Sequence, residues 1–563
     1  MKDNPPNSSA EFVFVALGGL GEIGMNSYLY GLGDTNNRQW LMVDLGITFP
    51  GENEPGIDII LPDLRFIESE SQNLIGIVIT HAHEDHIGAV AEMWPSLKVP
   101  VYMTPFAAGM LKAKLAEFPG CANPTIKEIP IKSSFKVGPF DLEFISMAHS
   151  IPETSGLVIK TPLGTAFHTA DWKIDTSPYI GDKTDKERIV QIGNYGIDAL
   201  ICDSTNSLRD GFTPSETEVA QSLSKIISQQ SGKIAITTFS SNIGRIKAIA
   251  DAARETGRQL VVSGRAFHRA IRVAIDTGYL PADFCYLDQE HCSFLAPEDV
   301  LALVTGSQGE PRAAMARIAS GEHRDIKLGK SDTVIYSSRT IPGNEKAILT
   351  VQNKLSGLGC KIITDDDDLV HVTGHPQRNE LVEMFTWAKP KIMIPMHGEM
   401  RHLRENALIA SRAGIPKIIT LVNGQILRIA PGKSKIIDVI KVGRCYRDGK
   451  LLFTEESALV RNRRKLSMVG FVAVALALTS RGEVLGDIDV VIDGVPIEDC
   501  YGELMENLIL DIIGGTIASI PKRRRKDHEM VRDALRRAIR AEIDRVWGKR
   551  PIVKVLMNVI ETK

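Results

Sequence analysis

The sequence predicts a mixed α/β protein made of several domains. Between residues 233 and 264, the short apolar runs KIAITTF and QLVVSG flank NIGRIKAIADAARETG, whose apolar residues recur with helical spacing. Strands that alternate with helices in this way favour a parallel sheet covered by helices. With 563 residues, of which 43% are hydrophobic, the chain is too long for one domain, so we expect two to four globular units.

Composition and charge exclude several classes of protein. The net charge of −3 gives no overall attraction to a polyanion, so a nucleic-acid partner would need a local basic cleft. The seven cysteines form no CxxC pair, which argues against disulfides and a thiolate zinc site and fits a reducing cytoplasm. Residues 1–12 hold no apolar targeting segment, and the longest apolar stretch, 468–478, is too short for a membrane span. We expect a cytoplasmic protein with no membrane partner.

Residues 19–24, GLGEIG, match the glycine fingerprint of dinucleotide-binding folds, and Asp44 follows at a spacing suited to a ribose-binding acid. The fingerprint requires a helix between the glycines and the second strand. Here the next residues, NSYLYGLGDTNNRQWLMVDLG, contain two apolar runs joined by a turn-rich segment. They predict a hairpin, so the glycines are expected to serve tight backbone turns.

The stretch IGIVITHAHEDHIGAV, residues 75–90, places ionisable side chains directly after a buried strand. On extended chain, His81 and His83 share a face, and the turn that follows lets Asp85 and His86 point to a neighbouring position. These side chains can therefore serve two adjacent metal ions. The alternative is a solvated polar loop, which four ligand-type side chains within six residues disfavour.

Further candidate ligands follow later apolar runs. Asp44 closes WLMVDLG, His149 lies in ISMAHSIPET, Asp171 in TAFHTADWKID and His397 in IMIPMHGEM. An aspartate after a strand is often a turn former, and an isolated histidine is usually an ordinary polar residue. The prediction therefore depends on the ordered set. His168 alternates out of phase with Asp171, which favours a packing role.

This ordered set resembles the metallo-β-lactamase fold hydrolases, whose fold is an αββα sandwich. The resemblance implies two divalent ions bridged by one aspartate, with Asp44 acting from behind the ligands. The implied groups are His81, His83 and His149 for the first ion and Asp85, His86 and His397 for the second, with Asp171 as the bridge. Imidazole and carboxylate ligands suit zinc, with manganese or magnesium as alternatives. Two such ions can share a hydroxide and hold both oxygens of an in-line phosphoryl displacement.

The long gap between Asp171 and His397 is large enough for an inserted domain, and its flanks carry a second resemblance. ICDSTN (201–206), HVTGH (371–375) and MHGE (396–399) resemble motifs A, B and C of the β-CASP nucleases. GGLGEIG and TGSQGEP are similar to segments of bacterial and archaeal ribonuclease J. The resemblance implies an inserted α/β β-CASP domain and an RNA substrate.

The same resemblance assigns roles outside the metal set. Asp203 would orient other groups, and His375 would contact the scissile phosphate or protonate the leaving oxygen. The implied substrate-binding residues are His371, Thr373, Gly374, Ser337, Ser338 and Arg339. This chain reads HVTGHP where HVSGHA is more usual, and HAHEDH where HGHEDH is frequent. The proline after His375 removes one backbone donor, which puts a phosphate contact from that amide in doubt.

The chain after residue 445 changes character. Strands are predicted at 468–479, 487–494 and 551–560, with a helix from about His528 to Trp547. KRRRK at 522–526 is either an RNA contact or a solvated helix start. The predicted division of the chain is 1–210 and 371–445 for the two parts of the metallo-β-lactamase domain, 211–370 for the β-CASP domain, 446–465 for a linker and 466–563 for an α/β domain that supports association.

The expected function is a ribonuclease J-like one in RNA processing and decay, including rRNA processing and mRNA decay. The resemblance implies a 5′-to-3′ exoribonuclease that also cuts internally, prefers 5′-monophosphorylated single strands and forms a homodimer or homotetramer. The alternatives are a DNA-directed β-CASP nuclease and a non-catalytic RNA-binding subunit, whose signature would be a broken metal set. The native metal, the transcripts, the balance of the two activities and partners such as a helicase stay open.

Overall fold

The computed structural model describes residues 10–117 and 123–561. Part of the amino-terminal segment, where no targeting sequence is expected, lies outside these residues. The chain forms two compact units. The first comprises Ile59–Cys445 with the segment that ends at Phe49, and the second comprises Pro50–Asp58 with Tyr446–Lys563. Among the described residues, no helix is both long and apolar enough to cross a membrane.

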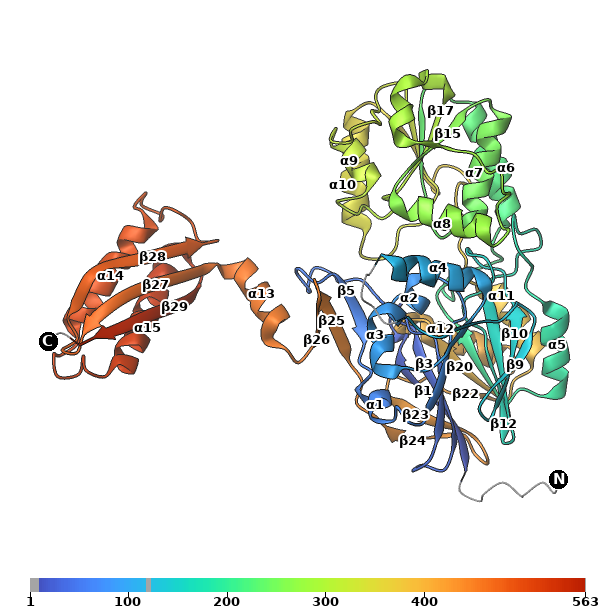
Figure 1. The fold of residues 1–563 in the computed structure, drawn as a ribbon, viewed down its shortest axis with the longest axis horizontal. Helices are drawn as coiled ribbons and strands as arrows, with labels where there is room; N and C mark the ends of the chain where they lie inside the picture. The colour runs from blue at the N-terminus through green and yellow to red at the C-terminus, as the bar shows by residue number, and fades with distance from the viewer. Residues whose placement is uncertain (1–9, 118–122, 562–563) are drawn as a thin grey trace. The chain divides into compact units, whose positions relative to one another are not determined.

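Two mixed sheets form the body of the first unit (Figure 1). The first sheet has the order β24 (Lys435–Val439), β23 (Gln425–Ala430), β1 (Glu11–Gly18), β3 (Ser27–Gly33), β4 (Gln39–Val43), β6 (Leu74–Val78), β7 (Val101–Met103) and β8 (Ile126–Glu128). The second has the order β22 (Lys417–Ile418), β20 (Ile392–Met396), β13 (Ala199–Asp203), β12 (Gly164–His168), β11 (Ser155–Thr161), β10 (Phe140–Ser146) and β9 (Ser134–Val137).

The two sheets pack face to face, with helices on both outer faces. Phe14, Tyr28, Phe144 and Ile394, from strands of both sheets, share one buried cluster. Alternate residues of the same strands, such as Val158, pack outward against helices. The outer helices are α1 (Arg65–Ser69), α2 (Glu84–Ile87), α3 (Val90–Leu97), α4 (Pro105–Ala116), α5 (Lys186–Tyr195), α11 (Arg378–Ala388) and α12 (Met400–Arg412). The predicted αββα sandwich is confirmed, because central strands of both sheets, such as β1 and β20, bury side chains on both faces.

The glycine-rich segment forms turns, as predicted. β1 pairs antiparallel with β3, and β3 pairs antiparallel with β4, so no helix separates the described strands here. The short strand β2 (Leu20–Gly21) pairs with β21 (Gly398–Glu399), and the His397 N–H donates to the Gly19 carbonyl at 2.9 Å. Gly19 has a φ of 89°, and a Cβ there would lie 2.4 Å from the Tyr28 hydroxyl. The glycine-rich segment therefore adopts the turn that holds the loop after β20, which carries His397, by a backbone hydrogen bond.

The inserted segment forms a six-stranded parallel sheet. Its order is β16 (Leu287–Asp288), β15 (Gln259–Ser263), β17 (Val300–Val304), β14 (Ile234–Thr237), β18 (Thr333–Tyr336) and β19 (Lys361–Ile363). The covering helices are α6 (Glu216–Ser228), α7 (Ile243–Glu255), α8 (Arg265–Asp276), α9 (Ala314–Ala319) and α10 (Glu345–Gly357). Ser215 and Glu218 form a capping box that starts α6. The predicted parallel α/β arrangement is confirmed, while the domain boundaries stay a prediction.

The second unit contains one three-stranded sheet, in the order β28 (Val484–Asp493), β27 (Phe471–Thr479) and β29 (Ile552–Ile560), with α14 (Met505–Ser519) and α15 (His528–Trp547). α15 has the bounds that the sequence predicts. The segment 446–465 contains most of β25 (Arg444–Asp448), β26 (Leu451–Thr454) and the start of α13 (Ala458–Val469), and its role as a linker stays a prediction. Within 522–526, Arg525 donates to the carbonyls of Ile520 and Ala518 and so caps α14.

Candidate metal centre

The predicted ligands converge because they follow strands that end at one edge of the sandwich. His81 follows β6, Asp171 follows β12 and His397 follows β20. Asp44 (φ 62°) and His397 (φ 50°) adopt left-handed backbone conformations directly after their strands. Such conformations cost about 1–3 kcal/mol each for non-glycine residues and persist where the surrounding fold imposes them. The backbone here is thus shaped to present side chains.

The first predicted ligand group, His81, His83, His149 and Asp171, lies together. One donor atom from each residue lies within 4.8 Å of the others. Nδ1 of His83 lies 3.2 Å from Nε2 of His81 and 3.1 Å from Nε2 of His149. Oδ2 of Asp171 lies 3.7 Å from Nε2 of His81 and 3.5 Å from Nε2 of His149. Three imidazole nitrogens and a carboxylate at these separations suit a cation.

The second group, Asp85, His86, His397 and Asp171, meets the same limit of 4.8 Å. His86 Nε2 lies 3.3 Å from Asp171 Oδ2 and 3.6 Å from Asp85 Oδ2. His397 Nε2 lies 3.1 Å from Asp85 Oδ2. The short helix α2 turns Asp85 and His86 away from His83, so one motif reaches both groups. Asp171 belongs to both groups and joins them.

Asp44 lies behind His86 rather than among the ligands. Its Oδ2 is 2.7 Å from His86 Nδ1, and it accepts hydrogen bonds from the Thr80 amide at 2.8 Å and hydroxyl at 2.9 Å. A carboxylate on the second ring nitrogen fixes the tautomer and leaves Nε2 for a ligand. Asn26, which sequence reasoning missed, lies 3.1 Å from His86 Nε2 and accepts from the Tyr28 hydroxyl at 2.8 Å.

Burial and nearby carboxylates give the histidines of the two groups different protonation states. Burial lowers the pKa of His83 to about 4 and holds the pKa of His81 and His149 well below the ordinary value. These imidazoles are neutral and keep the lone pair that a metal binds. Burial acts in the same direction on His86, but Asp171 and other carboxylates raise the pKa of His86 well above its ordinary value. The carboxylates therefore favour a positive charge here.

The donor chemistry fits divalent metal ions. Asp171 is 1% exposed, and its Oδ1 makes no hydrogen bond within the described structure although His397 Nδ1 lies 3.1 Å away. A buried carboxylate oxygen without a hydrogen bond is costly unless a cation satisfies it. The donors around it are imidazole nitrogens and carboxylate oxygens, which zinc and similar divalent ions accept, and they include no thiolate.

Asp203 and His375 form a pair beside the two groups. His375 Nδ1 lies 2.8 Å from Asp203 Oδ2, and the imidazole side chain is 21% exposed. Burial lowers the pKa of His375, but Asp203 and Asp171 outweigh it and raise that pKa above its ordinary value. Asp171, Asp203, His375 and His397 also make a third group of donors within 4.8 Å. The geometry thus permits His375 either to contact substrate or to serve as a ligand.

The HVTGH loop contacts the first predicted ligand group through its backbone. The Gly374 carbonyl lies 2.7 Å from His149 Nδ1, and the Thr373 hydroxyl accepts from Asn206 at 2.7 Å. Arg339 donates to the same Asn206 side chain at 3.1 Å. A Cβ on Gly374 would lie 2.4 Å from His149 Nδ1, so glycine is required for the loop to orient this imidazole. Asn206, within ICDSTN, links two predicted substrate residues and was missed.

The structure does not bring every predicted substrate residue to the surface of the site. Ser337 is fully buried, and its hydroxyl donates to the Val370 carbonyl at 2.7 Å and accepts from Arg245 at 2.6 Å. Its hydroxyl is therefore used to hold the chain. Ser338 Oγ and His371 Nδ1 are buried without a hydrogen-bond partner in the described structure. Both keep unused hydrogen-bonding capacity, and His371 is itself the first residue of the HVTGH loop.

His168 has the packing position that its phase predicts. It is fully buried, its Nδ1 lies 3.0 Å from the Tyr30 hydroxyl, and its ring packs edge-on against Tyr28. It belongs to none of the donor groups found among the described residues.

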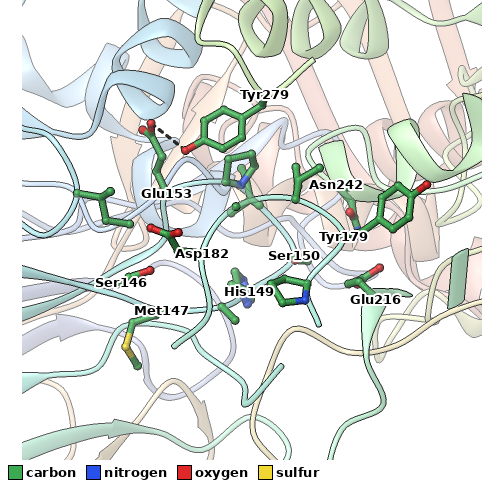
Figure 2. A pocket seen from close by; sticks show the side chains of 18 residues that line it. Ser146, Met147, His149, Ser150, Glu153, Tyr179, Asp182, Glu216, Asn242 and Tyr279 are labelled. Carbon is green, nitrogen blue, oxygen red and sulfur yellow. Dashed lines mark hydrogen bonds between the residues drawn. The ribbon is translucent and has the colours of Figure 1, made fainter. Parts of the chain in front are cut away.

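A pocket of about 280 Å³ opens next to His149 (Figure 2). Residues 146–153 form one wall, and Asn242, Gly244 and Tyr279 of the inserted segment contribute another. The Tyr279 hydroxyl donates to Glu153 at 3.1 Å across it. The inserted segment and the sandwich therefore share a cavity that borders the first ligand group.

Known sequence families match successive parts of the chain. A beta-lactamase superfamily domain matches residues 54–205, and a Zn-dependent metallo-hydrolase RNA specificity domain matches residues 366–419. The beta-CASP domain of ribonuclease J matches residues 231–355, and the C-terminal domain of ribonuclease J matches residues 458–560. A crystal structure of an Enterococcus faecalis V583 protein of unknown function covers 74% of this chain and 100% of its own, with a TM-score of 0.53 and 13% identity, which supports the fold alone.

Curated relatives cover most of the chain. Ribonuclease J of Sinorhizobium meliloti is 48% identical over 98% of this chain and 98% of its own length. Ribonuclease J of Thermus thermophilus is 33% identical over 96% of this chain and 94% of its own length. The matched families, the donor groups and these relatives all indicate a metal-dependent hydrolase of RNA. The chain belongs to the ribonuclease J family of metal-dependent RNA nucleases.

Proposed function

We propose that this chain is a two-metal ribonuclease that hydrolyses RNA phosphodiesters, as a 5′-to-3′ exonuclease and as an endonuclease. The observation that supports it most is the pair of donor groups that share Asp171. We assign His81, His83 and His149 to one ion and Asp85, His86 and His397 to the other. Zinc is the proposed metal, because three of the four donors of the first group and two of the four donors of the second are imidazole nitrogens. The complete ligand set disfavours a non-catalytic subunit.

When bound, the ions would supply positive charge and Lewis acidity at the scissile phosphate. The protein groups around them have separate tasks. Asp44 fixes the tautomer of His86, and the Gly374 carbonyl orients His149. Asp203 occupies Nδ1 of His375, so Nε2 is the ring atom left to contact a phosphate oxygen or give a proton to the leaving oxygen. Because the leaving oxygen is the 3′ oxygen of the upstream piece, the downstream piece keeps a 5′-phosphate.

The preference for a 5′-monophosphate requires a pocket for the end of the RNA, and the implied substrate-binding residues are its candidates. We propose that Thr373, Gly374, Ser338, His371 and Arg339 surround a terminal phosphate, with Ser337 holding the loop from behind. Arg339 carries a positive charge, and Ser338 Oγ and His371 Nδ1 have no hydrogen-bond partner in the described structure. Short donors on a tight loop suit a compact monophosphate rather than a triphosphate.

We expect 5′-monophosphorylated RNA to be degraded from its 5′ end at least about 10-fold faster than the triphosphorylated form, because charged groups left without hydrogen bonds cost about 1–3 kcal/mol or more. The measurement is product length over time with one RNA carrying either end group and an internal label. A matched DNA strand is the control for substrate class. Equal rates on the two RNA forms would refute the pocket, and equal cleavage of DNA would favour the DNA-directed alternative.

We also propose that the second unit associates with another copy, giving a homodimer or homotetramer. α14 and α15 cover one face of its sheet. On the other face, Ala475 is paired with Leu556 and Ala473 with Val491, whose side chains are 62% and 54% exposed. Apolar side chains gathered on an uncovered sheet face are typical of an interface.

The double substitution Val491→Lys and Leu556→Lys should reduce the molar mass in light scattering to that of a smaller species. Association would bury the introduced lysine charges of both copies in the interface, which is costly. Ile497→Lys is the matched control, since Ile497 is 78% exposed and lies outside the sheet. An unchanged mass in the double variant would exclude this face as the contact.

A further inference from the structure

A second pocket, of about 410 Å³, lies in the carboxy-terminal unit, and its lining is strongly basic. We define the basic groove by the side chains of Lys465, Arg532, Arg536, Arg540 and Lys554, with Asp533 as its one acidic residue. Consecutive residues from Pro551 to Val555 complete the lining. Consecutive residues of a strand point to alternate faces, so the groove follows the edge of the sheet.

The arginines form a row along α15. Val531, Leu535 and Ile539 are buried at intervals of four residues, and each is followed directly by an arginine of the groove. The row therefore lies beside the stripe that packs on the sheet, where α15 borders the edge strand β29 (Figure 1). Successive arginines are about 6 Å apart along the helix axis.

The charges of the groove are incompletely neutralised by the protein. Arg532 pairs with Glu529 at 2.6 Å, and Arg536 donates from Nε and Nη2 to one oxygen of Asp533 at 3.3 and 3.2 Å, so each arginine meets one carboxylate on the helix surface. An arginine has five N–H donors, so one carboxylate leaves most of them free. Arg540 makes no ion pair with a described carboxylate, and its Nε is buried without a hydrogen-bond partner. The groove thus holds donors directed at no protein acceptor.

We propose that the basic groove binds the phosphodiester backbone of single-stranded RNA, at a site separate from the metal centre. Guanidinium groups bind phosphate with two parallel hydrogen bonds, and a regular row of them follows a phosphate chain. The lining contains no aromatic side chain on which bases could stack, so binding is independent of sequence. The choice of RNA as occupant rests on the proposed function.

The edge strand strengthens the assignment. β29 pairs only with β27 among the described strands, so backbone N–H groups along its outer edge are available as further donors to phosphate oxygens. KRRRK at 522–526, the basic run that the sequence itself suggests, lies outside the lining of this groove. The spatial cluster instead gathers cations from α13, α15 and β29, which no single basic run reveals.

The test compares RNA binding by the full-length chain and by two triple variants, with a chelator present so that RNA is not hydrolysed. The groove variant carries Arg532→Gln, Arg536→Gln and Arg540→Gln. The matched control carries Lys522→Gln, Arg523→Gln and Arg524→Gln, which removes the same charge from the same unit. Fluorescence anisotropy with a long oligouridylate is measured over a range of salt concentrations.

We expect the groove variant to bind roughly 10- to 100-fold more weakly at low salt, with a dependence of log K on log salt that is shallower by about 2, because about 0.7 is lost per single-strand phosphate contact. The control should bind nearly as the wild type does. Equal loss in both variants, or no loss in the groove variant, would overturn the proposal. Selective loss of binding to an acidic peptide, with RNA binding intact, would assign the groove to a protein partner instead.

Two further measurements keep the test decisive. Arg540→Gln alone should lower the salt slope by about 0.7, and the triple Arg→Lys variant should restore most of the slope, so a folding defect in the triple Gln variant does not obscure the result. Hydrolysis of a dinucleotide, too short to reach a second site, should be unchanged in metal-loaded groove variants. A wild-type chain that neither binds nor cleaves RNA would refute the proposed function itself, an outcome distinct from failure of the groove.

Discussion

Replacing His83 by alanine should abolish RNA hydrolysis and reduce the bound metal below two ions per chain. The side-chain hydrogen-bond contacts of His83 in the described structure are to His81 and His149, so its removal opens the first donor group and leaves the side-chain contacts of Asp44 and His86 in place. Loss of groups that merely orient ligands lowers metal affinity by about 10- to 100-fold, and loss of a ligand should exceed that. Metal content by mass spectrometry and cleavage of labelled RNA are measured together.

The fold should survive this substitution. The sandwich buries extensive apolar clusters between its sheets and under its helices, so it does not depend on a metal for its core. The melting temperature with chelator present should therefore change little. His291→Ala is the control, because His291 is exposed in the inserted segment. Full activity of metal-depleted His83→Ala protein would end the two-metal proposal, whereas unfolding would show a structural role.

The sequence predicted which side chains would meet, because strand ends in this class of sheet lie at one edge. Asp44, Asp171 and His397 each follow an apolar run, and their backbones do end at the same edge. The division of the candidate ligands into two groups came from the resemblance to the metallo-β-lactamase fold hydrolases, which the order of these residues along the chain carries. The backbone conformations at these positions could not be predicted from the sequence. The left-handed conformations of Asp44 and His397 depend on hydrogen bonds from other segments of the chain.

The supporting residues show the limit of prediction from sequence more clearly. Asn26 reaches His86 from the hairpin that follows the glycine turns, and nothing in its local sequence distinguishes it from an ordinary turn residue. Ser337 was grouped with the substrate residues, yet Arg245 and the Val370 carbonyl occupy its hydroxyl. Both outcomes depend on partners far away in the chain, which periodicity and motif spacing do not specify.

The assignment of His375 has a sharper test, because the structure permits two roles for it. If His375 contacts phosphate or protonates the leaving oxygen, His375→Ala should retain its metals and lose roughly 10²-fold or more in the rate of hydrolysis. Asp203→Asn should act in the same direction, since Asp203 holds Nδ1 of His375 at 2.8 Å and so leaves Nε2 for substrate.

The third donor group, in which Asp171, Asp203, His375 and His397 lie within 4.8 Å, makes the opposite result meaningful. If His375 were a ligand, His375→Ala would lose metal and rate together, and excess metal would restore part of the rate. If His375→Ala keeps its metal but loses rate, and excess metal does not restore that rate, His375 acts on the substrate. His402→Ala is a suitable control. His402 lies on α12, five residues after His397 in the chain, but belongs to none of the donor groups found among the described residues. The partial exposure of His375, 21% against 1% or less for His81, His86 and His397, favours contact with substrate.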